Sequence, residues 1–158
     1  MDTNMKDIKL GITLSPVYWD ELPEFSVAFN DIELEKGLLD CTKHFNWTLP
    51  CIDNNVLSVN FLNKKDGDSV NGKDKALVID QIEIEGFKFY SFLMAGKYTP
   101  VYPEGYYEYA KQHGLSTEPV LTQTYLSFNG QWQLNITWPV FSWIHQTENL
   151  GWLYNKNI

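Results

Sequence analysis

Residues 57–86 read LSVNFLNKKDGDSVNGKDKALVIDQIEIEG and hold two apolar runs on either side of a polar loop, residues 63–75. Apolar and polar residues alternate over 57–61, which is typical of a strand with one buried face. The second run is continuously apolar over 76–79 and then alternates, which indicates a strand that is central at its start and half-exposed at its end. The stretch predicts two β-strands joined by a long loop.

The same period of two recurs along most of the 158 residues. Further strands are predicted at residues 8–14, 27–34, 44–49, 87–93 and 125–138. A one-residue slip at Asn30-Asp31 indicates a bulge, and Asn129-Gly130 favours a type I′ hairpin turn. Only residues 104–113 have a helical pattern. We therefore expect one all-β domain over residues 1–158, an antiparallel β-sandwich of the jelly-roll kind with one short helix.

The charge balance excludes two classes of partner. The chain has 20 Asp and Glu against 12 Lys, no Arg, and a net charge of −8. A polyanion is repelled by that charge, and Arg is the residue best suited to phosphate recognition, so we expect neither nucleic acid nor an anionic membrane as a partner. The first ten residues contain no apolar run typical of a signal peptide, which predicts synthesis in a cytoplasm.

Carboxylates gather in the polar loop and the strand after it, at Asp66, Asp68, Asp74 and Asp80. Oxygen ligands clustered in a glycine-containing loop are what calcium prefers, so calcium is a candidate cofactor; the alternative is a solvated loop. Asp80 shares strand parity with Val78 and Ile82 and points toward the core if no bulge intervenes. There it needs a metal, a lysine or backbone amides as a partner.

The aromatic residues offer two candidate contact surfaces. Exposed rings bind the apolar face of a sugar, which nominates one tyrosine-rich connection as a carbohydrate site; the alternative is that these rings pack the connection against the sandwich. The candidates are Tyr102, Tyr106, Tyr107 and Tyr109. Trp132 and Trp138 share a strand face and are predicted to lie in the core. Trp143 and Trp152 are candidates for an interface with neighbouring subunits, including a homo-oligomer, or for anchoring the tail to this domain.

Catalytic motifs are lacking. The three His are far apart in sequence, and the chain contains no nucleophile elbow, P-loop or dinucleotide fingerprint. Glycoside hydrolysis uses two carboxyl groups, and the sequence offers three candidate pairs: Asp20-Glu21, Glu83 with Glu85, and Glu104 with Glu108. We expect a protein that is not an enzyme, with an acidic glycoside hydrolase as the alternative.

Residues 72–86 resemble the signature strand of calcium-dependent xylan-binding carbohydrate-binding modules, which has the form Asp-Arg-Asn-Leu-Tyr-Val-Asp-Tyr-Ile followed by a Val-x-Gly turn. Five positions agree, namely Asp74, Leu77, Asp80, Ile82 and Gly86; Lys75 stands for the arginine and Ala76 for the asparagine. The resemblance implies a carbohydrate-binding-module-like β-sandwich that binds glycan with the help of calcium.

The C-terminal runs 128–132, 138–146 and 151–154 are similar to uncharacterised proteins of tailed, cyanophage-like phages. This similarity implies a particle component that is made in the host cytoplasm and then joins the virion. On this basis we expect a non-catalytic module for glycan adhesion or decoration on a phage particle. The alternative is a purely structural tail, neck or capsid assembly subunit, whose partners are other virion proteins.

Overall fold

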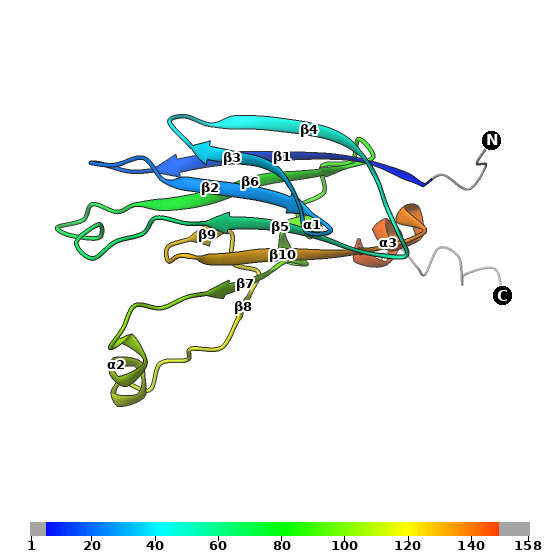
Figure 1. The fold of residues 1–158 in the computed structure, drawn as a ribbon. Helices are drawn as coiled ribbons and strands as arrows, with labels where there is room; N and C mark the ends of the chain where they lie inside the picture. The colour runs from blue at the N-terminus through cyan, green and yellow to red at the C-terminus, as the bar shows by residue number, and fades with distance from the viewer. Residues whose placement is uncertain (1–5, 149–158) are drawn as a thin grey trace.

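The computed structural model describes residues 6–148, which form two antiparallel β-sheets packed face to face (Figure 1). The first sheet has the order β4-β1-β6-β9, built from β1 (Asp7–Val17), β4 (Lys43–Pro50), β6 (Ala76–Ile84) and β9 (Tyr125–Leu126). The second has the order β3-β2-β5-β10-β7-β8, built from β2 (Glu24–Phe29), β3 (Ile32–Leu38), β5 (Asn54–Phe61), β7 (Lys97–Pro100), β8 (Val120–Leu121) and β10 (Gly130–Thr137). The predicted antiparallel β-sandwich is confirmed.

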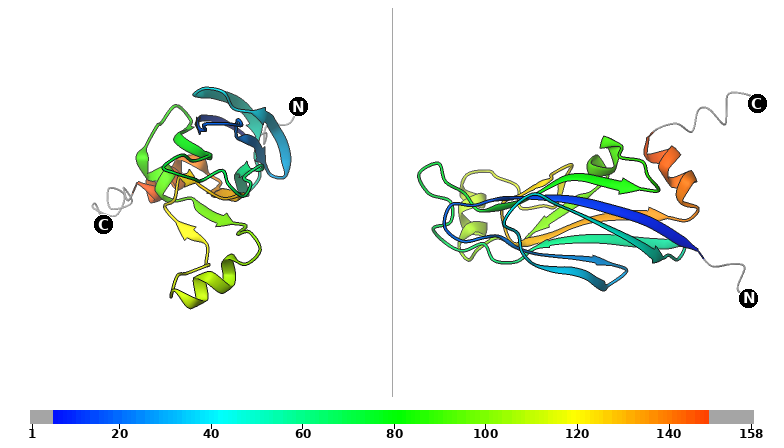
Figure 2. Two further views of the ribbon diagram at one scale, coloured as in Figure 1. Left: turned by 90° about the vertical axis from the view of Figure 1, so that its left-hand side faces the viewer. Right: turned by 90° about the horizontal axis from the view of Figure 1, so that it is seen from above.

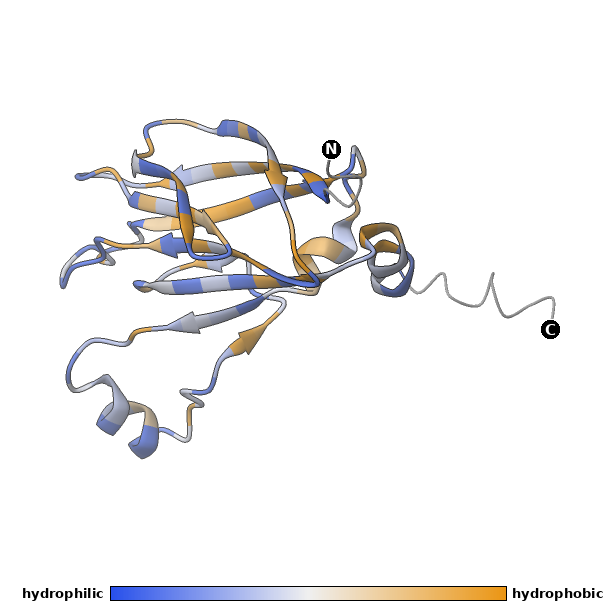
Figure 3. Cartoon of the chain, turned by 45° about the vertical axis from the view of Figure 1, so that its right-hand side comes forward, coloured by the Kyte–Doolittle hydropathy of each residue, from blue (hydrophilic) through white to orange (hydrophobic). Residues whose placement is uncertain are grey.

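The core lies between the two sheets. It is built from the alternate residues of each strand whose side chains point inward. Along β1, alternate residues from Ile8 to Leu14 are at most 2% exposed, and along β10 Trp132, Leu134 and Ile136 are fully buried. Figure 3 shows this alternation as changing colours along the strands. Each of these side chains stabilises the fold by about 2 kcal/mol through its burial, so the period of two in the sequence determines which face of each strand points inward.

The segment 27–34 is a hairpin rather than one bulged strand. Asn30 and Asp31 have φ angles of 51° and 66° and join β2 to β3, with Phe29 opposite Ile32. Asn and Asp tolerate the left-handed conformation that such a two-residue turn needs. The register shift lies three residues before the predicted bulge, between Val27 and Ala28.

The predicted hairpin at 125–138 is wrong. β9 pairs with β6 in the four-stranded sheet, whereas β10 pairs with β5 and β7 in the six-stranded sheet. Residues 127–129 therefore carry the chain from one sheet to the other. Trp132 is buried as predicted, and Trp138 packs against the core while remaining partly exposed.

Three helices occur within residues 6–148: α1 (Tyr90–Met94), α2 (Tyr106–Gln112) and α3 (Val140–Thr147). The helix predicted at 104–113 is confirmed in α2. The strand predicted at 87–93 is wrong, because Phe89, Phe92 and Leu93 follow the i, i+3, i+4 spacing of one helical face. None of the three helices has the length and apolar character needed to span a membrane.

Helices α1 and α3 lie toward one end of the sandwich, and the β5–β6 loop, α2 and the start of β10 lie at the other (Figures 1 and 2). Trp143 of α3 is 8% exposed and stacks on Phe92 of α1 with ring centroids 5.5 Å apart. Its ring therefore packs within its own chain. Trp152, the other predicted interface residue, lies outside the described residues.

Candidate functional site

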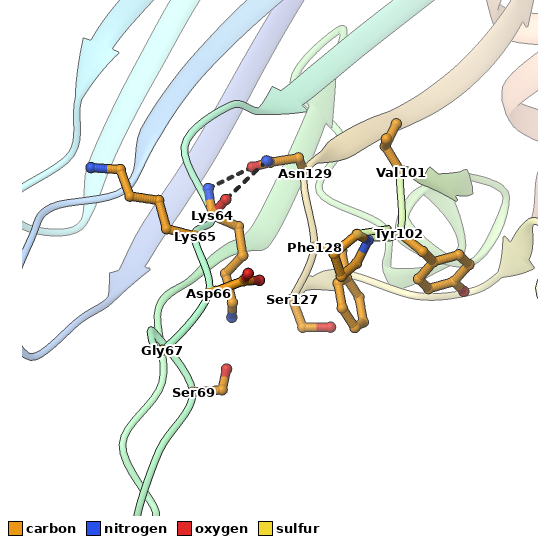
Figure 4. A pocket seen from close by; sticks show the side chains of 11 residues that line it. Lys64, Lys65, Asp66, Gly67, Ser69, Val101, Tyr102, Ser127, Phe128 and Asn129 are labelled. Atoms are coloured by element: carbon orange, nitrogen blue, oxygen red, sulfur yellow. Dashed lines mark hydrogen bonds between the residues drawn. The ribbon is translucent and has the colours of Figure 1, made fainter. Parts of the chain in front are cut away.

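Three chain segments meet at the end of the sandwich away from α3 and enclose a cavity of about 470 Å³ (Figure 4). They are the loop after β5, the residues that follow β7, and the crossing segment before β10. The cavity is lined by Lys64, Lys65, Asp66, Gly67, Ser69, Val101, Tyr102, Pro103, Ser127, Phe128 and Asn129. The predicted acidic loop and the predicted tyrosine-rich connection, more than thirty residues apart in sequence, thus line one cavity.

Asn129 ties the three segments together. Its side-chain Oδ1 accepts a hydrogen bond from the Lys64 backbone N–H at 2.6 Å, and its Nδ2 donates to the Lys64 carbonyl at 3.1 Å (Figure 4). Its own carbonyl accepts from the Val101 N–H at 2.6 Å. The cavity rim is therefore fixed by hydrogen bonds before any ligand arrives, which lowers the entropic cost of binding.

One wall of the cavity is aromatic. The Tyr102 ring lies edge-on to Phe128 with centroids 5.0 Å apart and stacks on Tyr106 at 4.3 Å. Tyr107 meets the edge of Tyr102 at 5.7 Å, while Tyr109 stacks on His113. The four predicted tyrosines thus lie on one connection, but Tyr102 alone among them lines the cavity.

Phe128 was missed as a site residue, because its alternation with Leu126 placed it in a predicted hairpin. The backbone of Phe128 is hydrogen-bonded to Tyr98, whose side chain is buried and only 2% exposed. The Tyr98 hydroxyl accepts from the Phe128 N–H at 3.0 Å and donates to the Phe128 carbonyl. Burial raises the pKa of Tyr98, so its hydroxyl keeps the proton that it donates.

The opposite wall is stabilised by Asp74. Its Oδ1 accepts hydrogen bonds from Lys64 Nζ at 2.6 Å, from the Lys75 N–H at 2.8 Å and from the Ser69 hydroxyl, and its Oδ2 accepts from the Tyr125 hydroxyl at 2.6 Å. Burial raises the pKa of the Asp74 carboxyl, but the hydrogen bonds from Lys64, Ser69 and Tyr125 outweigh it and lower the pKa to about 2. Burial and Asp74 together raise the pKa of Tyr125 to about 12.

A second ion pair lies beneath the same loop. The Lys75 side chain is 1% exposed, and its Nζ lies 3.2 Å from Asp68 Oδ2 and 3.7 Å from Glu21 Oε2. Glu21 also pairs with Lys65 at 3.0 Å on the surface. A lysine ammonium thus neutralises carboxylates at the position where the sequence led us to consider a metal ion.

Asp80 does not point into the core as its parity predicted. Thr13 pairs with Gln81 and Leu14 with Ile79, so Asp80 is the additional residue of a bulge between β1 and β6. The bulge reverses the parity and leaves Asp80 exposed, where its carboxylate accepts a hydrogen bond from the Ser15 hydroxyl.

The four predicted metal ligands do not fit a calcium ion. Asp74 is hydrogen-bonded by Lys64, Asp68 pairs with Lys75, and Asp80 lies on the outer face of the sheet. Asp66 lines the cavity apart from them. Calcium takes six to eight oxygen ligands around one point, and residues 6–148 contain no group of three or more His, Cys, Asp or Glu placed to hold a metal.

We therefore expect the melting temperature to be insensitive to calcium. Scans in millimolar calcium chloride and in chelator should agree within about 1 °C, because only a ligand bound to the folded state raises the melting temperature. Differential scanning calorimetry provides the measurement. A rise of several degrees in calcium would contradict this expectation and support the metal site that the sequence predicted.

Comparison with known proteins gives a likeness in fold. No protein-family model matches the sequence, and no curated protein matches it. A solved structure of vCBM60 in complex with galactobiose aligns with a TM-score of 0.50 and 14% identity over 81% of this chain and 99% of that chain. The SeMet form of vCBM60, from work linking two families of calcium-dependent carbohydrate binding modules, aligns with a TM-score of 0.51 and 13% identity over 80% of this chain and 89% of that chain. The chain has the fold of a carbohydrate-binding module.

Proposed function

We propose that the protein is a non-catalytic module that binds glycan in the cavity between Tyr102 and the Lys64–Ser69 loop. The observation that carries the proposal is the Tyr102 ring, held against Phe128 at the rim of a preformed cavity that polar side chains also line. An aromatic ring covers the apolar face of a sugar while polar groups beside it bond the hydroxyls. The likeness to vCBM60, solved with galactobiose, supports the same class of ligand.

The charges around the cavity favour an uncharged glycan. Lys64 is already paired with Asp74 and Lys65 with Glu21, so neither ammonium is available to an acidic sugar. Asp66 makes no ion pair or hydrogen bond with any described residue and faces an incoming ligand with a negative charge. Together with the net charge of −8, this arrangement repels uronic acids and sulfated sugars.

The lining argues for binding rather than hydrolysis. Glycoside hydrolysis uses two carboxyl groups on either side of the scissile bond. Among the described residues that line the cavity, Asp66 is the single carboxylate. Of the nominal pairs in the sequence, Glu21 is held by Lys65 and Lys75, and Glu85 accepts a hydrogen bond from the Lys9 N–H at 3.0 Å.

The setting of the module stays a prediction. A place on a virion, where a glycan-binding module serves adhesion or decoration, rests on the resemblance of the C-terminal sequence alone, since no family model and no curated protein matches the chain. The alternative of a purely structural assembly subunit rested on Trp143 and Trp152, and Trp143 packs inside its own chain. Glycan adhesion is therefore the function that we propose for such a particle component.

Replacing Tyr102 with alanine should weaken glycan binding about tenfold or more, because the ring that covers the sugar is lost. A glycan array first identifies the ligand, and isothermal titration calorimetry with that ligand then measures the affinity. We expect uncharged oligosaccharides to bind, in chelator as well as in calcium.

Two matched variants serve as controls for Tyr102→Ala. Tyr102→Phe keeps the ring and should retain most of the affinity. Tyr109→Ala removes a ring that is 51% exposed on the same connection but lies outside the cavity, and it should bind as the wild type does. An array without hits, or equal losses in Tyr102→Ala and Tyr109→Ala, would count against the cavity as the binding site.

A further inference from the structure

A second cavity, of about 590 Å³, lies on the outer face of the six-stranded sheet and adjoins the candidate site. Val101 and Asn129 line both cavities, and both are labelled in Figure 4. From this shared edge the second cavity extends over β10 and β5, where Gln131, Gln133 and Asn60 line it. The two cavities therefore meet at the edge formed by Val101 and Asn129, close to Tyr102.

The strand register aligns polar side chains across this face, because cross-strand partners lie on the same side of a sheet. The first row consists of Ser26, Asn60, Gln131 and Thr99, on β2, β5, β10 and β7. The second row, on the same strands, begins with the small apolar Ala28 and continues with the polar Ser58, Gln133 and Lys97. Trp132 lies between the two glutamines in sequence and points into the core, so Gln131 and Gln133 both face outward.

The amides in these rows are available to a ligand. Asn60 Nδ2 donates to the Ser26 hydroxyl at 3.0 Å, whereas the side chains of Gln131 and Gln133 make no hydrogen bond with any described residue. Each glutamine amide offers two N–H donors and a carbonyl acceptor, and a sugar hydroxyl both donates and accepts. The lining of the second cavity contains no charged side chain among the described residues, which matches an uncharged ligand.

We propose that this amide-lined face binds the continuation of a glycan whose first sugar lies against Tyr102, so that the protein recognises an uncharged chain of several sugars. The inference rests on the proposed function, because it needs a sugar in the first cavity. It is carried by the shared edge at Val101 and Asn129 and by the two unpaired amides beyond it.

The test compares short and long oligosaccharides of one linkage. Isothermal titration calorimetry with β-1,4-linked galactose oligomers, and in parallel with β-1,4-linked xylose oligomers, should give an affinity about tenfold higher for the hexamer than for the dimer. That gain corresponds to two or three additional hydrogen bonds. Gln131→Ala combined with Gln133→Ala should abolish the gain and leave dimer affinity unchanged.

Asn135→Ala is the matched control, because Asn135 lies on the same strand and the same outer face but outside the cavity. It should keep both the dimer affinity and the gain with length. Equal affinity for dimer and hexamer in the wild type would overturn the extension and leave the first cavity as the whole site. A gain that survives in the double variant would place the additional sugars elsewhere, and binding of neither series would remove the proposed function together with this inference.

Discussion

Lys75→Met should lower the free energy of unfolding by about 3 kcal/mol at neutral pH, the loss typical of removing one partner from a buried ion pair. The Lys75 side chain is 1% exposed and that of Asp68 is 13% exposed, so Asp68 would keep a poorly solvated negative charge. The hydrogen bond that remains to this carboxylate comes from the Lys65 backbone N–H, which donates to Asp68 Oδ2 at 2.6 Å. Urea unfolding at pH 7 provides the measurement.

Two further variants separate the charge from the packing. Lys65→Met makes the same chemical change in the same loop, but Lys65 is 61% exposed and its pair with Glu21 lies at the surface, so stability should change little. Adding Asp68→Asn to Lys75→Met removes the stranded charge and should recover most of the loss. If Lys75→Met is as stable as Lys65→Met, the buried ammonium does not hold the loop.

The fold could be predicted largely from alternation, and it departs from prediction where alternation breaks down. Burial forces every second residue of β1 and β10 inward, so a pattern of period two identifies the strands. The inward orientation predicted for Asp80 was wrong, because it is reversed by a bulge opposite Thr13 and Leu14. That bulge depends on pairing with a strand more than sixty residues away. Pairing also separates β9 from β10, although Asn129-Gly130 has the local signature of a hairpin.

The candidate site was predictable in its parts but not in its assembly. Tyr102 and Asp66 could be nominated from sequence alone, because loops carry binding residues, rings stack on sugars and carboxylates bind cations. That Lys64 and Lys75 neutralise the neighbouring carboxylates depends on how the loop folds back, which no spacing rule specifies. The same holds for Asn129, whose bonds to the Lys64 backbone join segments 65 residues apart.

Asp74→Asn should also destabilise the protein by about 2 kcal/mol at pH 7, and this loss should disappear in acid. The Asp74 carboxyl titrates at about 2 in the folded protein against an ordinary 3.8. A carboxyl with a lowered folded pKa stabilises the fold above its unfolded pKa and loses that effect as the pH falls through the folded value. A difference of nearly two pKa units corresponds to about 2 kcal/mol, lost between about pH 5 and pH 2.

The measurable quantity is the difference between wild type and Asp74→Asn in urea unfolding at each pH, because the other acids of the chain titrate equally in both proteins. Asp66→Asn is the matched control: it removes a carboxylate of the same loop that bonds to no described residue, and its difference from the wild type should be small at every pH. Tyr125→Phe tests the same hydrogen bond from the other side. The raised pKa of Tyr125, about 12, means that its contribution is lost as the pH rises from about 10 through 12. A difference between wild type and Asp74→Asn that stays constant from pH 7 to pH 2 would mean that the charge of Asp74 does not stabilise the wall of the cavity.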